Sequence, residues 1–443
     1  MDHMVDTANA GRRWDALAVA FAISAAGSAC GSASSGGAQG GEDGGASAGD
    51  AAPSGPDGGS APPDAASDTT GGDSSGPRDG SAGPDGSLPH PGSSAWVMGY
   101  YASWHSPANG GNYAVSSIDW DGLTHVAAAF YVPDSSGGWA SGYFDQATAG
   151  SLISAAHAQG KKVLASIGGS GSGPAFEQAM QNAQSTFVTN LEALVTSGYD
   201  GLDIDWEGGN LTAAQDQALE TTLVQALRQK SPGILITLTA GYENENNLDD
   251  LSWYGTVAAQ LDRVNLMTYG MAGPWQGWRS WHSSPLHWNS DGTTPTGIDA
   301  SVKHYIAAGV PAAKLGVGIG FYGMCYTAPV TAPVQTLGAS QVSASDGVMS
   351  YPNIMGTYYS AGAYHYDSAA AAPYLTLDGK NAQSCTYVSY EDPTSIAAKG
   401  AWLKAQGLGA VILWEIGEGF VPSGATVQAQ NPLLEATRTA FLQ

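Results

Sequence analysis

The sequence predicts a (β/α)8 TIM barrel over residues 95–443, and three observations support this prediction. Apolar runs of strand length alternate with helix-like segments, which implies βαβ units and a parallel sheet. There are eight such runs, the number that closes a barrel of this kind. One run carries carboxylates at alternate positions, which places the acids on one face of a strand. The eight runs span residues 95–101, 123–131, 161–167, 200–206, 233–240, 262–269, 314–321 and 409–414.

Capping signals define two of the helices between these runs. Residues 212–229 begin with Thr212 and Gln215, which have the spacing of a capping box. Residues 393–406 follow Asp392 as N-cap, carry proline in the first turn and end before a glycine. In a barrel of this type the active site lies at the carboxyl ends of the strands.

The segment that precedes the barrel has two parts with different compositions. In residues 1–30, Arg12 and Arg13 precede an apolar run too short to span a bilayer, which is typical of a cleavable signal peptide. The sequence Gly-Ser-Ala-Cys ending at Cys30 resembles a bacterial lipoprotein cleavage box, and a lipidated Cys30 and an incidental cysteine remain open alternatives. We expect an exported protein, either extracellular or a lipoprotein tethered to the outer cell surface through Cys30.

Residues 31–94 are expected to be a disordered linker. They consist largely of Gly, Ser, Ala, Pro and Asp and hold too few apolar residues to offset the entropy cost of ordering. They carry several acidic residues and only one arginine, so repulsion between like charges extends the segment. It could serve as a tether or be a passive spacer, and both alternatives remain open.

Composition also limits the ligands. The formal net charge is −24 and there is no basic cluster, which argues against nucleic acids and anionic membranes as partners. Only 12% of residues are charged, yet the chain holds 13 Trp and 20 Tyr. Many of these rings serve the core. Aromatic rings also stack on the apolar faces of sugars, which are uncharged ligands.

The fourth apolar run carries the candidate catalytic residues. Its carboxylates alternate with large apolar residues, so the acids share one face and the apolar side chains share the other. Inside a barrel, three adjacent like charges are costly, and at least one acid should hold a proton. This arrangement suits acid catalysis. The three acids are Asp203, Asp205 and Glu207.

The pattern Asp200-x-x-Asp203-x-Asp205-x-Glu207 resembles the signature of family-18 glycoside hydrolases, the chitinase family. The run Ser166-Ile167-Gly168-Gly169, at the end of the third predicted strand, resembles the second signature of that family. The resemblance extends over roughly residues 95–443.

The resemblance implies a substrate-assisted retaining mechanism. Glu207 would protonate the glycosidic oxygen, and the 2-acetamido oxygen of the substrate would attack the anomeric carbon. Asp205 would bind the acetamido N–H and share a proton with Asp203, while Tyr269 would donate to the acetamido oxygen. The residue after Tyr269 is Gly270, where the family motif has Asp, which leaves the effect on Glu207 open.

The resemblance also implies a set of residues that contact the sugar. For Tyr100 and Phe130, an ordinary core position remains an alternative. A further cluster of tryptophans follows Gly270 in a stretch rich in Gly, Pro and Ser, which favours a sugar-binding rim over the core. The predicted substrate-binding residues are Tyr100, Phe130, Trp206, Met267, Trp275, Trp278, Trp281 and Trp414.

Residues 324–392 resemble the small α+β insertion that subfamily A chitinases carry between barrel strands seven and eight. Cys325 and Cys385 lie near its ends, and a disulfide between them suits an exported protein. Two unpaired buried thiols are the alternative.

We expect a monomer that acts on chitin or chitooligosaccharides, and no metal or cofactor. The nine histidines include no pair at ligand spacing with cysteine or carboxylate partners nearby. Alternative substrates are peptidoglycan or N-glycans, as for an endo-β-N-acetylglucosaminidase. A non-catalytic chitin-binding, lectin-like protein is an alternative from another class, although such proteins typically lose the acid at the Glu207 position.

Overall fold

The computed structural model describes residues 95–140, 144–246, 248–273, 277–288, 294–338 and 341–443. The predicted signal peptide, Cys30 and the predicted linker lie outside these residues and stay predictions. Within the described ranges, no helix is both long enough and apolar enough to cross a bilayer.

Eight parallel strands close into a barrel in the order β1-β13-β7-β6-β5-β4-β3-β2, which confirms the predicted fold class. Each strand begins and ends within two residues of its predicted run. Their bounds are β1 Trp96–Ala102, β2 His125–Tyr131, β3 Lys162–Gly169, β4 Gly201–Trp206, β5 Leu235–Gly241, β6 Arg263–Met267, β7 Leu315–Gly320 and β13 Ala410–Trp414.

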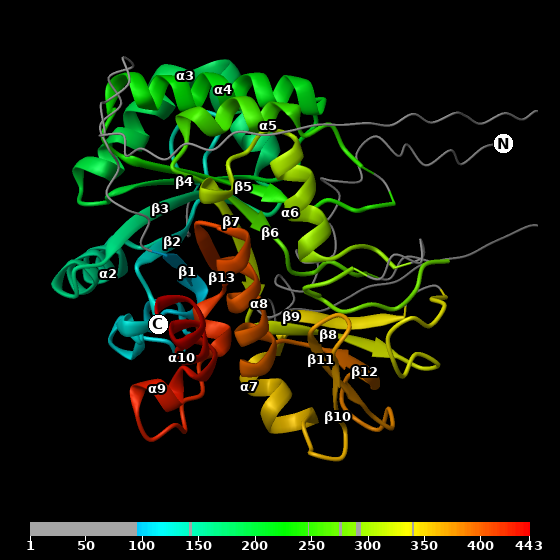
Figure 1. Cartoon of the computed structure of the whole chain (residues 1–443). Helices are drawn as coiled ribbons and strands as arrows, with labels where there is room; N and C mark the ends of the chain where they lie inside the picture. Colours follow the sequence, from blue (N-terminus) through cyan, green and yellow to red (C-terminus); the bar gives the residue numbers. More distant parts are fainter. Residues whose placement is uncertain (1–94, 141–143, 247, 274–276, 289–293, 339–340) are drawn as a thin grey trace, which may run out of the picture. The chain divides into compact units, whose positions relative to one another are not determined.

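Helices follow most of the strands and cover the outside of the barrel (Figure 1). The predicted caps are present: Thr212 and Gln215 form a capping box, and Asp392 accepts from the backbone N–H of Ser395 at 2.8 Å. The helix bounds are α2 Gln146–Ala158, α3 Gly173–Thr196, α4 Ala213–Lys230, α5 Ser252–Val257, α6 Ile298–Ala307, α7 Tyr351–Asn353, α8 Pro393–Gln406, α9 Val427–Gln430 and α10 Pro432–Thr437.

A second sheet is formed by the chain between β7 and β13. It is antiparallel, with the order β10-β11-β12-β8-β9, and lies beside the barrel (Figure 1). A disulfide joins Cys325 to Cys385, which confirms the expected pairing and links neighbouring strands. The strand bounds are β8 Tyr322–Thr327, β9 Val342–Ser350, β10 Tyr364–Asp367, β11 Ala372–Thr376 and β12 Cys385–Ser389.

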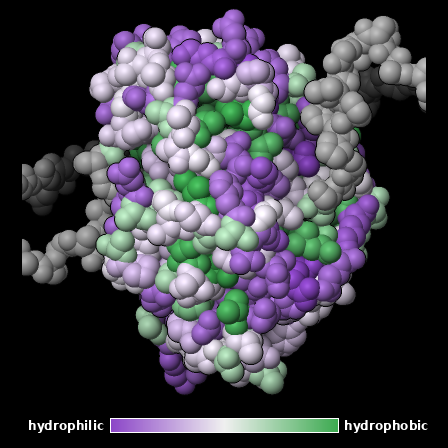
Figure 2. Space-filling model, turned by 90° about the vertical axis from the view of Figure 1, so that its left-hand side faces the viewer, coloured by the Kyte–Doolittle hydropathy of each residue, from purple (hydrophilic) through white to green (hydrophobic). Residues whose placement is uncertain are grey.

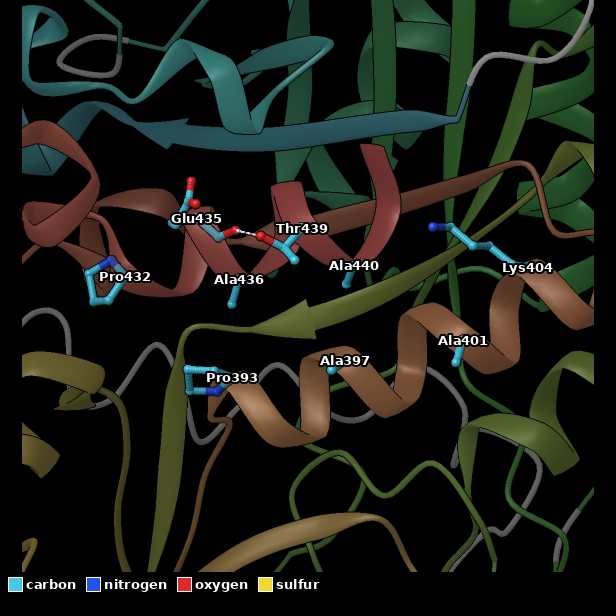
Figure 3. Close-up of a pocket in the computed structure, with 9 residues that line it drawn as sticks. All are labelled: Pro393, Ala397, Ala401, Lys404, Pro432, Glu435, Ala436, Thr439 and Ala440. Atoms are coloured by element: carbon cyan, nitrogen blue, oxygen red, sulfur yellow. Dashed lines mark hydrogen bonds between the residues drawn. The ribbon is translucent and has the colours of Figure 1, made fainter. Parts of the chain in front are cut away.

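Few large apolar side chains are exposed among the described residues. Figure 2 shows one face of the molecule, on which apolar residues form separate patches between hydrophilic ones. A groove runs between α8 and the C-terminal helix α10 with the turn that follows it (Figure 3). Its lining is mostly alanine and proline, with Lys404, Glu435 and Thr439, and it contains none of the predicted catalytic residues.

Candidate active site

Asp203 lies fully buried in the centre of the barrel, between two hydroxyl side chains. The strand register places Ser166 of β3 on one side of it and Thr237 of β5 on the other. Asp203 accepts hydrogen bonds from the Ser166 hydroxyl at 2.8 Å, from the Tyr100 hydroxyl at 2.9 Å and from Thr237. Burial raises the pKa of Asp203, although these three donors favour the charged form.

Asp205 is the next acid of the ladder and is also buried. Its carboxylate accepts a hydrogen bond from Thr239 of β5. Its backbone faces Gly168, where a Cβ would lie 2.1 Å from the Asp205 carbonyl oxygen. Gly168 also has φ of 115°, a conformation that favours glycine. The close contact between β3 and β4 therefore requires the glycine of the Ser-x-Gly-Gly motif.

Glu207 follows the last residue of β4 and is half-buried at the carboxyl end of the strand. Its carbonyl oxygen accepts from the backbone N–H of Gly173 at 2.7 Å, at the start of α3. A Cβ on Gly173 would lie 1.9 Å from the Gly208 carbonyl oxygen, so glycine is needed for this approach. The turn after the ladder is thereby fixed, with the Glu207 side chain at the mouth of the barrel, where a general acid can reach a substrate.

Tyr269 lies two residues beyond β6 and faces the same acids. Burial raises the pKa of its hydroxyl well above the usual value, and the charges of Asp205 and Glu207 raise it further. The hydroxyl therefore keeps its proton at neutral pH and can donate a hydrogen bond. Space for the ring comes from β7, because a Cβ on Gly318 would lie 2.7 Å from Tyr269 Cε1.

Gly270, the departure from the family motif, has φ of 60°. A Cβ there would lie 3.4 Å from the Tyr322 hydroxyl, an ordinary contact. Glycine adopts this left-handed conformation without strain, and Asn or Asp tolerate it better than most residues. The backbone at this position therefore suits the family's Asp as well as the glycine found here.

Aromatic rings gather beside the ladder and form what we call the aromatic floor: Tyr100, Trp104, Phe130 and Trp414. The Trp414 ring stacks on Phe130, with centroids 5.5 Å apart, and meets the Tyr100 ring edge-on at 5.4 Å. Trp104 lies 6.1 Å from Trp414 and is 47% exposed. Trp104 is not among the substrate-binding residues predicted from the sequence. The feature of the sequence that could have indicated a role in sugar binding is its position just past the carboxyl end of the first strand.

Two predicted sugar contacts are wrong. Trp206 is buried on the opposite face of β4 from the acids, where it stacks on Phe176 with centroids 4.6 Å apart. Trp281 is 2% exposed, and its indole N–H donates to the Thr296 carbonyl at 2.8 Å. Both are core residues. The alternation of β4 puts Trp206 outside the barrel wall, and a buried hydrogen-bond partner holds Trp281 inside.

The other predicted contacts have different outcomes. Trp278 is half-buried and packs against Met324 and Tyr326 of the second sheet, and Trp275 lies outside the described residues. Met267 is half-buried at the carboxyl end of β6.

Asp200, the first acid of the signature, lies at the opposite end of β4 from Glu207. It accepts from Lys162 at 2.7 Å and from the backbone N–H of Val163 at 2.9 Å, and its other neighbour is His157. Its position fixes the start of β4, so within the signature it has a structural role.

Within the described residues, one group of side chains has the composition of a metal site: His105, Glu415 and Glu418. No metal was expected from the sequence, because no pair of histidines has ligand spacing with cysteine or carboxylate partners nearby, and His105 is roughly 300 residues from the two glutamates. The fold brings them together beyond the carboxyl ends of β1 and β13.

Comparisons with known proteins agree with this geometry. The family model described as glycosyl hydrolases family 18 matches residues 96–419. Chitinase A1 of Niallia circulans is 26% identical over 403 residues, which cover 72% of this chain and 56% of that protein. The chain therefore spans little more than half the length of that relative.

Two solved structures show the same fold. A chitinase from Rhizomucor miehei has a TM-score of 0.65 at 25% identity, covering 78% of this chain and 99% of that one. A chitinase-like agglutinin from Robinia pseudoacacia has a TM-score of 0.60 at 24% identity, covering 78% and 99%. The match of the family model over most of the barrel, together with the ladder on β4, shows that this chain belongs to the glycosyl hydrolases of family 18.

Proposed function

We propose that this protein hydrolyses the β-1,4 bonds between N-acetylglucosamine units of chitin and chitooligosaccharides. The observation that carries the proposal is the ladder itself. Asp203 and Asp205 are buried and bound by hydroxyl donors, while Glu207 is half-buried at the mouth of the barrel. The acid that must reach the substrate is thus the accessible one.

We propose a retaining mechanism in which the substrate supplies the nucleophile. Glu207 protonates the glycosidic oxygen as the 2-acetamido oxygen attacks the anomeric carbon, which gives an oxazolinium intermediate. Asp205 accepts a hydrogen bond from the acetamido N–H, and the protonated Tyr269 donates to the acetamido oxygen. Glu207 then removes a proton from the water that opens the intermediate. The buried pair of Asp203 and Asp205 supplies negative charge that stabilises the cationic ring.

The aromatic floor supports a polymeric substrate. Trp414 and Phe130 lie beside the ladder, and the exposed Trp104 extends the floor away from it. Rings at successive positions can stack on successive sugars of a linear chain, which favours chitin over the branched core of an N-glycan. Peptidoglycan remains an alternative substrate because its glycan is also a linear polymer that contains N-acetylglucosamine.

A second function, sugar binding without hydrolysis, is raised by the fold shared with a chitinase-like agglutinin. The presence of Glu207 and of the complete ladder favours catalysis, because a binding protein needs no buried stack of acids.

The test is the hydrolysis of a defined N-acetylglucosamine hexamer, followed by proton NMR of the earliest products. We expect cleavage with the β configuration retained at the new reducing end. The fully deacetylated hexamer should not be cleaved, since an amine cannot form the oxazolinium ion. In partly acetylated chains every new reducing end should carry an acetyl group.

Four outcomes would contradict parts of this proposal. Inversion at the anomeric carbon, or deacetylated sugars at new reducing ends, would remove the roles given to Asp205 and Tyr269. Binding of the hexamer without any cleavage would support the sugar-binding alternative. Faster cleavage of peptidoglycan than of chitin would keep the mechanism and change the substrate.

A further inference from the structure

A buried charged pair lies outside the acid ladder, between α8 and the residue before its N-cap. Lys399 of α8 is 0% exposed, and its ammonium group forms an ion pair with Glu391, which is 3% exposed. Lysine and glutamate are almost never fully buried unless they are paired. Burial lowers the pKa of Lys399 and raises that of Glu391, and the charge of each residue opposes this effect on the other. The proposed hydrolysis uses neither residue.

The lysine has a second partner, which leads toward the active site. Its ammonium group donates to the hydroxyl of Ser284 at 3.0 Å, and that hydroxyl donates to the backbone carbonyl oxygen of Thr268 at 2.6 Å. Ser284 and Thr268 are both buried. A hydroxyl that accepts from a cation becomes a better donor, because consecutive hydrogen bonds polarise one another. Lys399 therefore strengthens the contact that holds Thr268, the residue directly before Tyr269.

The residues after Tyr269 are held by the neighbouring serine, Ser283. The backbone N–H of Gly270 donates to the Ser283 hydroxyl at 3.3 Å, and that of Met271 donates to the Ser283 carbonyl oxygen at 2.8 Å. Ser283 is held in turn from the second sheet, since its own N–H donates to the hydroxyl of Ser389 in β12 at 2.9 Å. The backbone on both sides of Tyr269 is therefore bound to two consecutive serines.

Thr268 also connects this backbone to β7, the strand against which the Tyr269 ring packs. The Thr268 hydroxyl donates to the Gly318 carbonyl oxygen at 2.9 Å and accepts from the Gly318 N–H at 2.8 Å. The ring lies so close that a Cβ on Gly318 would be 2.7 Å from Tyr269 Cε1. A shift of Thr268 would therefore change the position of the phenol ring relative to β7.

We propose that Lys399 and Ser284 are positioning residues for Tyr269. They hold the Thr268 carbonyl and so set the point at which the Tyr269 hydroxyl donates. This inference rests on the proposed function, which gives Tyr269 the role of donor to the acetamido oxygen. Such a donor is effective only when it is aimed at the place where charge develops, and a misplacement of about 1 Å can cost about 10²-fold in rate.

The test is a double-mutant cycle of S284A with Y269F, measured as kcat and KM on the N-acetylglucosamine hexamer. Y269F removes a donor to the developing charge and should lower kcat by about 10²-fold. S284A breaks the connection from Lys399 to Thr268 and should lower kcat by about tenfold with little change in KM. In the Y269F background S284A should have no further effect, because the hydroxyl that it positions is absent.

S280A is the matched control. Ser280 is buried in the same segment of the chain, and its hydroxyl donates to the Ala332 carbonyl oxygen at 2.8 Å, away from the residues around Tyr269. A general loss of stability would affect S280A and S284A alike, whereas the inference expects unaltered kinetics for S280A. K399M should reproduce the kinetics of S284A. Should K399M fail to fold because Glu391 loses its cation, S284A decides alone, since it leaves the ion pair intact.

Three outcomes would overturn the inference. They are an S284A enzyme with unaltered kcat, an equal loss of kcat in S280A, and a loss from S284A that is as large in the Y269F background as in the unaltered chain. The cycle also separates this inference from the proposed function. A Y269F enzyme with unaltered kcat would contradict the role of Tyr269 itself, whereas a large loss in Y269F with independent effects of S284A would contradict only the positioning role.

Discussion

Two clusters of buried carboxylates adjoin the aromatic floor, and their oxygens have different partners. In the ladder, hydroxyl groups surround the acids, and Tyr100 connects Asp203 to the floor. In the group of His105, Glu415 and Glu418, the partners are other titratable side chains: His105 pairs with Glu415 at 2.5 Å, and Glu418 is hydrogen-bonded to Asp346. Asp346 connects that second group to the floor through Trp414.

The difference shows what each cluster can do. Hydroxyl donors stabilise a carboxylate without adding charge, so the ladder can gain or lose a proton during a reaction. In the second group the partners are themselves titratable, so each contact depends on the protonation state of both side chains. Burial alone therefore does not distinguish the two clusters. The neighbouring donors do.

The largest effect should come from E207Q. Glutamine keeps the shape of the side chain but has no transferable proton, and general acid catalysis contributes about 10²–10⁴-fold. We expect kcat on the N-acetylglucosamine hexamer to fall within this range while hexamer binding persists. E192Q, which alters a carboxylate paired with Lys230 on the surface, is the control and should keep full activity. An E207Q enzyme with a tenth of the original kcat would contradict the assignment.

A smaller effect is expected when the ladder loses one hydroxyl donor. T239V replaces the partner of Asp205 by a side chain of the same shape without a hydroxyl. A hydrogen bond to a charged group contributes about 1.5–3 kcal/mol, so kcat should fall by about 10- to 100-fold with little change in KM.

The matched control for that variant is T222V. Thr222 is exposed on α4 and donates only to the carbonyl oxygen of Ala218. This variant should have unaltered kinetics. If T239V were as active as the unaltered chain, the hydroxyl partners of the ladder would have no catalytic importance. The difference in partners between the two clusters would then have no consequence for catalysis.

The smallest effect concerns Glu243, a buried acid that has few hydrogen-bond donors and belongs to neither cluster. Its side chain accepts from the backbone N–H of Asp249 at 3.0 Å, and burial raises its pKa to about 7. Since the pKa is higher in the folded state, the folded state binds the proton more tightly. This contribution to stability is complete below about pH 4.5 and is lost as the pH rises through 7.

E243Q should remove that pH dependence. Between pH 5 and 8 the unaltered chain should lose about 1–2 kcal/mol of unfolding free energy relative to E243Q, measured by urea unfolding at several pH values. E435Q is the control. Arg438 lowers the pKa of Glu435, so any pH effect of that variant lies below pH 4.5. Parallel curves for E243Q and the unaltered chain would show that Glu243 titrates normally.

The sequence by itself determined the features that depend on local patterns. The barrel strands lie within two residues of the apolar runs, and the caps at Thr212 and Asp392 are where their spacing placed them. The ladder was also predictable, because the period of two in a strand fixes which side chains share a face. These features need no information about residues distant in the chain.

Only the tertiary structure decided which partners these residues have. The partners of Asp203 come from three other strands, since the register between strands selects Ser166 and Thr237. Packing decided that Trp281 is a core residue, although its surroundings in the sequence favoured a rim. His105 and Glu415 are roughly 300 residues apart in the chain and meet because β1 and β13 are neighbours that close the barrel. Composition and spacing carry no signal for such a meeting, because it depends on how strands pair around the whole barrel.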